Sequence, residues 1–129
     1  MTSAAETRDA LDAFQRTVET GELQSLLDIL APDVVLLGDG GGVKQAVPRP
    51  IVGADKVARL LAGGWGRVAG ISSLRPAQVN GYPALILHLD GELDSVLALR
   101  IDDGLITGIY ALRNPEKLSH MERETILRR

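Results

Sequence analysis

The stretch that decides the fold runs from Ile71 to Leu112 and reads ISSLRPAQVNGYPALILHLDGELDSVLALRIDDGLITGIYAL. Its apolar residues form four runs, which are Ile71 to Val79, Tyr82 to Leu89, Leu93 to Ile101 and Leu105 to Leu112. The runs are separated by Asn80-Gly81, Asp90-Gly91 and Asp103-Gly104, and such dipeptides are favoured in two-residue hairpin turns. The stretch therefore predicts a four-stranded antiparallel meander.

The residues before the meander predict three helices and one further strand. Ser3 and Glu6 have the spacing of a capping box, and apolar residues then recur at helical intervals until Gly21. A second short helix begins at Leu23 and is stopped by Pro32, after which DVVLLG, residues 33–38, predicts a buried strand. The third helix, centred on residues 57–61, is expected to end at the Gly63-Gly64 pair, which places Trp65 on the loop beyond it.

This order of elements indicates the fold class. Helices followed by a meander are typical of an α+β domain in which the helices cover one face of a curved antiparallel sheet. The 129 residues are enough for one such domain with its own core.

The three turns also predict the register of the meander, because a two-residue loop determines every later pair. Ser73 should pair with His88, Arg75 with Ile86, and Leu97 with Tyr110. One predicted face carries Ser73, Arg75, Ile86, His88, Ser95, Leu97, Leu99, Ile106 and Tyr110. The other carries Leu85, Leu87, Leu89, Val96, Ala98 and Ile109. Since the helices can cover only one face, the second set is expected to meet a partner, such as another copy of the chain in a homodimer.

The composition excludes several classes of function. The net charge is -3, so no basic surface is available for direct nucleic-acid binding. There is no cysteine, and only His88 and His120 offer imidazole, so no metal site is expected. No run approaches the roughly 18 apolar residues of a membrane span, and no signal sequence is recognisable, which favours a cytoplasmic protein without membrane contact.

A glycine-rich segment, LLGDGGGVKQAVPRPIVG at residues 36–53, joins the first strand to the third helix. A Walker-type phosphate loop needs a Lys-Ser/Thr pair after its glycines and opens directly into a helix, and this segment has neither feature. A nucleotide cofactor is therefore not expected. The remaining interpretations are a surface turn and a docking element, because consecutive glycines allow both positive φ and close approach of another backbone.

Several segments together resemble the SnoaL-like domain, of the nuclear transport factor 2-like superfamily, that forms the C-terminal extension of certain extracytoplasmic-function (ECF) sigma factors. They are LAPDVVLLGDGGG, RPIVGADKVARLLAG, VNGYPALILHLDG and NPEKL. The family motif Asp-Gly-Gly-Gly-Lys is matched by Asp39, Gly40, Gly41, Gly42 and, after an inserted Val43, Lys44. The motif Asn-Pro-Asp-Lys-Leu is matched by Asn114, Pro115, Glu116, Lys117 and Leu118.

The resemblance implies that residues 1–129 form a single SnoaL-like domain, shaped as a cone with helices closing one side of a curved sheet. It also implies a bacterial, non-catalytic regulator of transcription initiation. Such a domain docks on the sigma-factor core or the RNA polymerase holoenzyme, with the glycine loop and the Asn-Pro motif near the contact.

The same superfamily includes ketosteroid isomerases, polyketide cyclases and epoxide hydrolases, which implies an enzymatic alternative. In that alternative Asp39 acts as the general base, and His88 or Tyr110 donates a hydrogen bond to the developing oxyanion. Each residue also has a structural interpretation: a turn former, a hydrogen-bonded sheet residue and a packed ring, respectively.

A third alternative is a ligand sensor, in which a small apolar molecule occupies the cone and alters the docking surface. The residues expected around such a pocket are Arg49, Trp65, Ser73, Arg75, His88, Ser95 and Tyr110.

Overall fold

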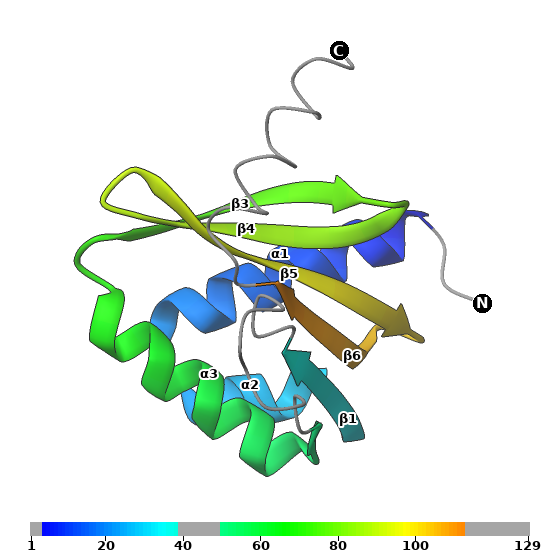
Figure 1. The fold of residues 1–129 in the computed structure, drawn as a ribbon. Coiled ribbons are helices and arrows are strands. Elements are labelled where there is room, and N and C mark those ends of the chain that lie inside the picture. Colours follow the sequence, from blue (N-terminus) through cyan, green and yellow to red (C-terminus); the bar gives the residue numbers. More distant parts are fainter. Residues whose placement is uncertain (1–3, 39–49, 113–129) are drawn as a thin grey trace.

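The computed structural model describes residues 4–38 and 50–112 of the chain. The helices lie on one side of a curved sheet (Figure 1). In chain order the elements are α1 (Ala4–Thr20), α2 (Leu23–Ile29), β1 (Leu30–Gly38), β2 (Ile51–Val52), α3 (Ala54–Val68), β3 (Ser72–Val79), β4 (Tyr82–Leu89), β5 (Glu92–Asp102) and β6 (Leu105–Leu112). The predicted α+β class is confirmed.

The sequence of α1 explains why this helix packs one of its faces against the sheet. Leu11, Phe14 and Val18 recur every three to four residues along α1, and all three are buried. Gly21 ends the helix with a φ of 69°, and its N–H donates to the carbonyl oxygens of Thr17 and Val18, each at 3.1 Å. Glycine adopts this left-handed conformation without steric cost.

The third helix is longer than the sequence predicts. It continues through Gly63 and Gly64 to Val68, so the predicted end at the glycine pair is wrong, and Trp65 lies on the helix. Each glycine weakens a helix by about 1 kcal/mol relative to alanine. However, Ala62 and Trp65, on either side of the pair, both pack against the core. Tertiary packing therefore outweighs the local cost.

The sheet has the strand order β2-β1-β6-β5-β4-β3. Strands β3 to β6 form the predicted antiparallel meander, whereas β1 pairs parallel with β6 and antiparallel with β2, so the complete sheet is mixed. All three turns are confirmed. Asn80, Asp90 and Asp103 each have a φ of 51°, and the glycines after them have φ values of 83°, 80° and 78°. Two successive positive φ angles define a type I′ turn.

Two register shifts in the pairing of β5 correct the predicted faces. Ser73 pairs with His88 and Arg75 with Ile86, as predicted. The predicted pair of Leu97 with Tyr110 is wrong, because Leu97 pairs with Ala111 and Tyr110 pairs with Ala98. The shifts occur between Leu87 and His88 in the β4–β5 ladder and between Arg100 and Ile101 in the β5–β6 ladder. One extra residue reverses the side-chain alternation, so β5 presents its residues to the opposite faces from those predicted.

Because of this reversal, the residues predicted for the partner face lie on two different faces of the sheet. Leu85 and Ile109 are 0% and 3% exposed within the core beneath the helices, so they cannot meet a partner. Val96 and Ala98 lie on the other face, which we call the open face because none of the described helices packs against it. Part of that face is nevertheless buried, since Val96 and Ala84 are 3% and 0% exposed in a second cluster with Val79, Ile86, Leu93 and Leu112. Ser95 is moved to the helix side, where it is 6% exposed.

The core between helices and sheet is aliphatic apart from one phenylalanine. Its fully buried side chains are Phe14, Leu26, Val34, Val57, Leu85, Leu99 and Ile106. Among the residues that the structure describes, no helix is both long enough and apolar enough to cross a membrane.

Candidate functional site

An apolar groove of about 500 Å³ lies on the open face of the sheet. Its floor crosses β1, β6 and β5, and residues at the turn between β3 and β4 also line it. Among the residues that line it are Val35, Leu37, Tyr82, Ala98, Arg100, Gly108, Tyr110 and Leu112.

The hollow exists because small residues occupy the middle of the sheet. Gly108 lies between Val35 of β1 and Arg100 of β5, and Ala98 lies beside Tyr110. A Cβ atom placed on Gly108 would stand 3.5 Å from the Cβ of Arg100 and 3.9 Å from the carbonyl oxygen of Val35, which is ordinary contact. Gly108 therefore leaves space that a larger side chain would fill.

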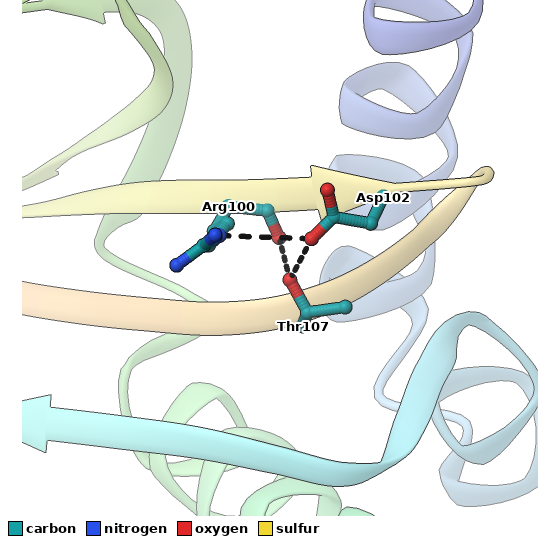
Figure 2. Close-up of polar contacts among 3 residues, drawn as sticks. All are labelled: Arg100, Asp102 and Thr107. Atoms are coloured by element: carbon teal, nitrogen blue, oxygen red, sulfur yellow. Dashed lines mark hydrogen bonds and ion pairs between the residues drawn. The ribbon is translucent and has the colours of Figure 1, made fainter. Parts of the chain in front are cut away.

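One charged residue, Arg100, is among the described residues that line the groove. Its Nε lies 3.6 Å from Oδ2 of Asp102. The Thr107 hydroxyl lies 2.7 Å from the same Oδ2 and 3.2 Å from the Arg100 carbonyl oxygen, so its single proton is shared between two acceptors. Figure 2 shows the end of the Arg100 guanidinium pointing away from Asp102. The terminal nitrogens can therefore donate hydrogen bonds to a further anionic partner.

Large apolar side chains remain exposed around the groove. Leu37, Tyr82 and Tyr110 are 39%, 55% and 44% exposed, respectively. Tyr82 and Tyr110 are the two tyrosines of the whole chain, and both stand at this groove. Tyrosine and arginine are enriched at protein interfaces, so the composition of the rim is that of a contact surface.

The described residues that were predicted to line a ligand pocket do not form one pocket in the structure. Tyr110 lines the groove, while Ser73, Arg75 and His88 lie further along the open face on β3 and β4. Ser95 is on the helix side because of the register shift in β5. Trp65 is on α3, where its Nε1 donates to the carbonyl oxygen of Glu19 at 3.0 Å. That bond satisfies a carbonyl in the last turn of α1, which gives Trp65 a structural role.

The two described members of the enzymatic alternative are not adjacent. Tyr110 pairs with Ala98, which pairs with Ala84, and His88 lies four residues further along β4. Four residues of strand correspond to about 13 Å. His88 and Tyr110 are therefore alternative donors in separate parts of the sheet, and the structure does not bring them into one site. Within residues 4–38 and 50–112, no group of three or more His, Asp and Glu side chains is placed to hold a metal ion.

The predicted docking residues, and the predicted pocket residue Arg49, lie outside the described residues. They are Asp39, Gly40, Gly41, Gly42, Lys44, Asn114, Pro115, Glu116, Lys117 and Leu118. The strands that lead to the two motifs are nevertheless described. Gly38, the last residue before Asp39, pairs with Ala111, three residues before Asn114. Because β1 and β6 are parallel, the described strands that precede the two motifs end on the same side of the sheet.

Sequence reasoning missed the groove residues Leu37 and Tyr82. One signal was present, since Gly108 interrupts the strand LITGIYAL, and glycine inside a strand marks a bulge or a site of close approach.

No family model matches the chain. Its sequence is 33% identical over 120 residues to the Probable ECF RNA polymerase sigma factor SigI of Mycobacterium tuberculosis, covering 93% of this chain and 39% of that protein. It is 30% identical over 122 residues to the ECF RNA polymerase sigma factor SigJ of the same organism, covering 86% of this chain and 38% of SigJ. The chain thus spans less than two fifths of the length of each of these relatives.

Two solved structures show the same fold. The crystal structure of M. tuberculosis SigJ matches with a TM-score of 0.67 at 25% identity, over 88% of this chain and 44% of that chain. An NTF-2 like protein from Burkholderia xenovorans matches with a TM-score of 0.64 at 17% identity, over 85% of this chain and 84% of that one. The second likeness, at such low identity, concerns the fold alone.

Proposed function

We propose that this chain, a SnoaL-like domain of the nuclear transport factor 2-like superfamily, is a non-catalytic regulator of an ECF sigma factor in transcription initiation. The observation that carries the proposal is its similarity to SigI over 93% of its residues, together with its similarity to SigJ in both sequence and structure. Its partner is the sigma-factor core, alone or within the RNA polymerase holoenzyme, in the bacterial cytoplasm.

The geometry at the ends of β1 and β6 supports one docking surface for both motifs. Gly38 and Ala111 are paired, so the glycine loop and the Asn-Pro motif begin from adjacent strand ends. A partner that contacts one motif is therefore within reach of the other. Two motifs starting from neighbouring backbone positions can act together with little loss of conformational entropy.

The proposal is tested with the part of SigJ that lies outside the matched domain, which we call the SigJ core. Calorimetry should detect binding of the purified chain to the SigJ core, and addition of the chain should change promoter-directed transcription by RNA polymerase loaded with that core. The B. xenovorans NTF-2 like protein is the matched control, because it shares the fold at 17% identity. If the chain and this control behave alike in both assays, the regulatory function is wrong.

Substitutions in the glycine loop separate the regulator from the enzyme. Asp39→Asn keeps the size of the side chain and removes its charge, so a regulator should keep most of its affinity for the SigJ core. An enzyme that uses Asp39 as its base should lose about 10²- to 10⁴-fold in turnover of a keto or epoxide substrate. Gly41→Val should weaken docking, because a β-branched residue resists positive φ and blocks close approach.

A further inference from the structure

We infer that the groove on the open face is a second part of the docking surface, and that it receives an apolar side chain flanked by a carboxylate. An amphipathic segment of the sigma-factor core would present both groups. The inference rests on the proposed function and extends it, since it adds described residues to a contact predicted only from the two motifs.

The charge of the lining determines the chemistry of the occupant. Arg100 is the only charged residue among the described lining residues, and its guanidinium extends away from Asp102 (Figure 2). A carboxylate from the partner can therefore form a hydrogen-bonded ion pair with the outer nitrogens of Arg100. The rest of the lining is mainly aliphatic or aromatic, so the carboxylate should stand beside an apolar side chain.

The shape and exposure of the groove favour a protein segment over a small molecule. Pockets for small molecules enclose most of the ligand surface. Here Tyr82 and Tyr110 are each about half exposed at the rim, and the groove crosses three strands. Tyrosine and arginine, which both line this groove, are enriched among interface hot spots.

The groove is also continuous with the strand ends that lead to both predicted docking motifs. Leu37 lines it and lies two residues before Asp39, while Leu112 lines it and lies two residues before Asn114. The groove is therefore adjacent in sequence and in the sheet to the strand ends from which both motifs follow.

A second copy of the chain fits the groove less well. In a two-fold symmetric contact the same patch meets itself, so two copies of Arg100 would enter one interface. No acidic residue is present among the described lining residues to neutralise that pair. Charge complementarity therefore favours a different, acidic partner.

The experiment measures the Kd of the full chain for the SigJ core with two groove variants and two controls. Tyr110→Ala removes a rim ring, and Arg100→Glu reverses the single lining charge. Leu60→Ala and Arg59→Glu make equivalent changes on exposed positions of α3, where Leu60 is 46% exposed and Arg59 pairs with Asp55 at 3.1 Å. Each groove variant should raise the Kd at least about 10-fold, as expected for hot-spot residues, and each control should stay within about 2-fold.

Gly108→Leu provides a variant that blocks the groove without removing any contact. The φ of Gly108 lies outside the left-handed region, and its added Cβ meets only ordinary van der Waals neighbours, so the variant should fold. Its thermal unfolding should be cooperative, and its Kd for the SigJ core should rise at least about 10-fold. An unchanged Kd in a folded Gly108→Leu protein overturns the inference.

The outcomes distinguish this inference from the proposed function. If the wild-type chain binds the SigJ core and the three groove variants bind it equally well, the regulatory function stands and the groove has no part in it. If the variants instead convert a sedimenting dimer to a monomer and leave the Kd unchanged, the occupant is a second copy, and the inference is wrong. If the wild-type chain does not bind, the proposed function fails, and the groove inference fails with it.

Discussion

Replacing Leu85 with alanine tests the corrected assignment of the sheet faces. The predicted register placed Leu85 on the partner face, but in the structure its side chain is 0% exposed beneath the helices. The substitution removes three carbon atoms, worth about 2.4 kcal/mol at about 0.8 kcal/mol each. The cavity left behind adds to this loss, because buried Leu→Ala changes cost about 2.7 to 5 kcal/mol. We expect the free energy of unfolding to fall by about 3 to 4 kcal/mol.

Urea unfolding followed by circular dichroism measures the effect. With a slope of about 2 kcal/mol/M, the midpoint should fall by about 1.5 to 2 M. Leu37→Ala is the matched control, since the same chemical change at a side chain 39% exposed on the open face leaves no closed cavity and should cost about 1 kcal/mol or less. Equal losses for the two variants, or a loss below about 1 kcal/mol at Leu85, would refute the assignment of Leu85 to the core.

Three further predictions concern single interactions. Trp65→Phe removes the hydrogen bond to the Glu19 carbonyl, so the free energy of unfolding should fall by about 1 kcal/mol and the melting temperature by about 4 °C in calorimetry. Asn80→Val places a β-branched residue at a φ of 51° and should cost about 1 to 2 kcal/mol in urea unfolding; an unchanged midpoint would contradict the type I′ turn. Gln15→Met should cost about 1 kcal/mol, because the Gln15 side-chain amide donates to the Leu74 carbonyl oxygen at 3.1 Å and joins α1 to β3.

The sequence was sufficient for the elements whose signals are local. The turns at Asn80, Asp90 and Asp103 were predictable because the residue pairs that tolerate positive φ are few and easily recognised. The burial of Leu11, Phe14 and Val18 followed from their spacing on α1. Their order along the chain was enough to indicate an α+β domain with helices on one face of a sheet.

The tertiary structure alone decided which residues share a surface. The extra residue in each ladder of β5 has no sequence signal of its own, yet it moved Leu97 and Ser95 to one face and Val96 and Ala98 to the other. Bulges arise where the curvature of the whole sheet favours them, so local patterns cannot place them. The continuation of α3 past Gly64 had the same origin, since packing by distant residues outweighed a local preference.

The candidate site depends most strongly on such long-range contacts. The groove joins Leu37 of β1, Tyr82 of β4, and Arg100 and Gly108 of β5 and β6, which are far apart in the chain. Sequence motifs predicted a docking function, but they could not show that β1 pairs parallel with β6, so that the strands preceding both motifs end side by side. A parallel pair needs a long connection between its strands. The pairing of β1 with β6 therefore depends on the packing of the whole domain, and the sequence of neither strand predicts it.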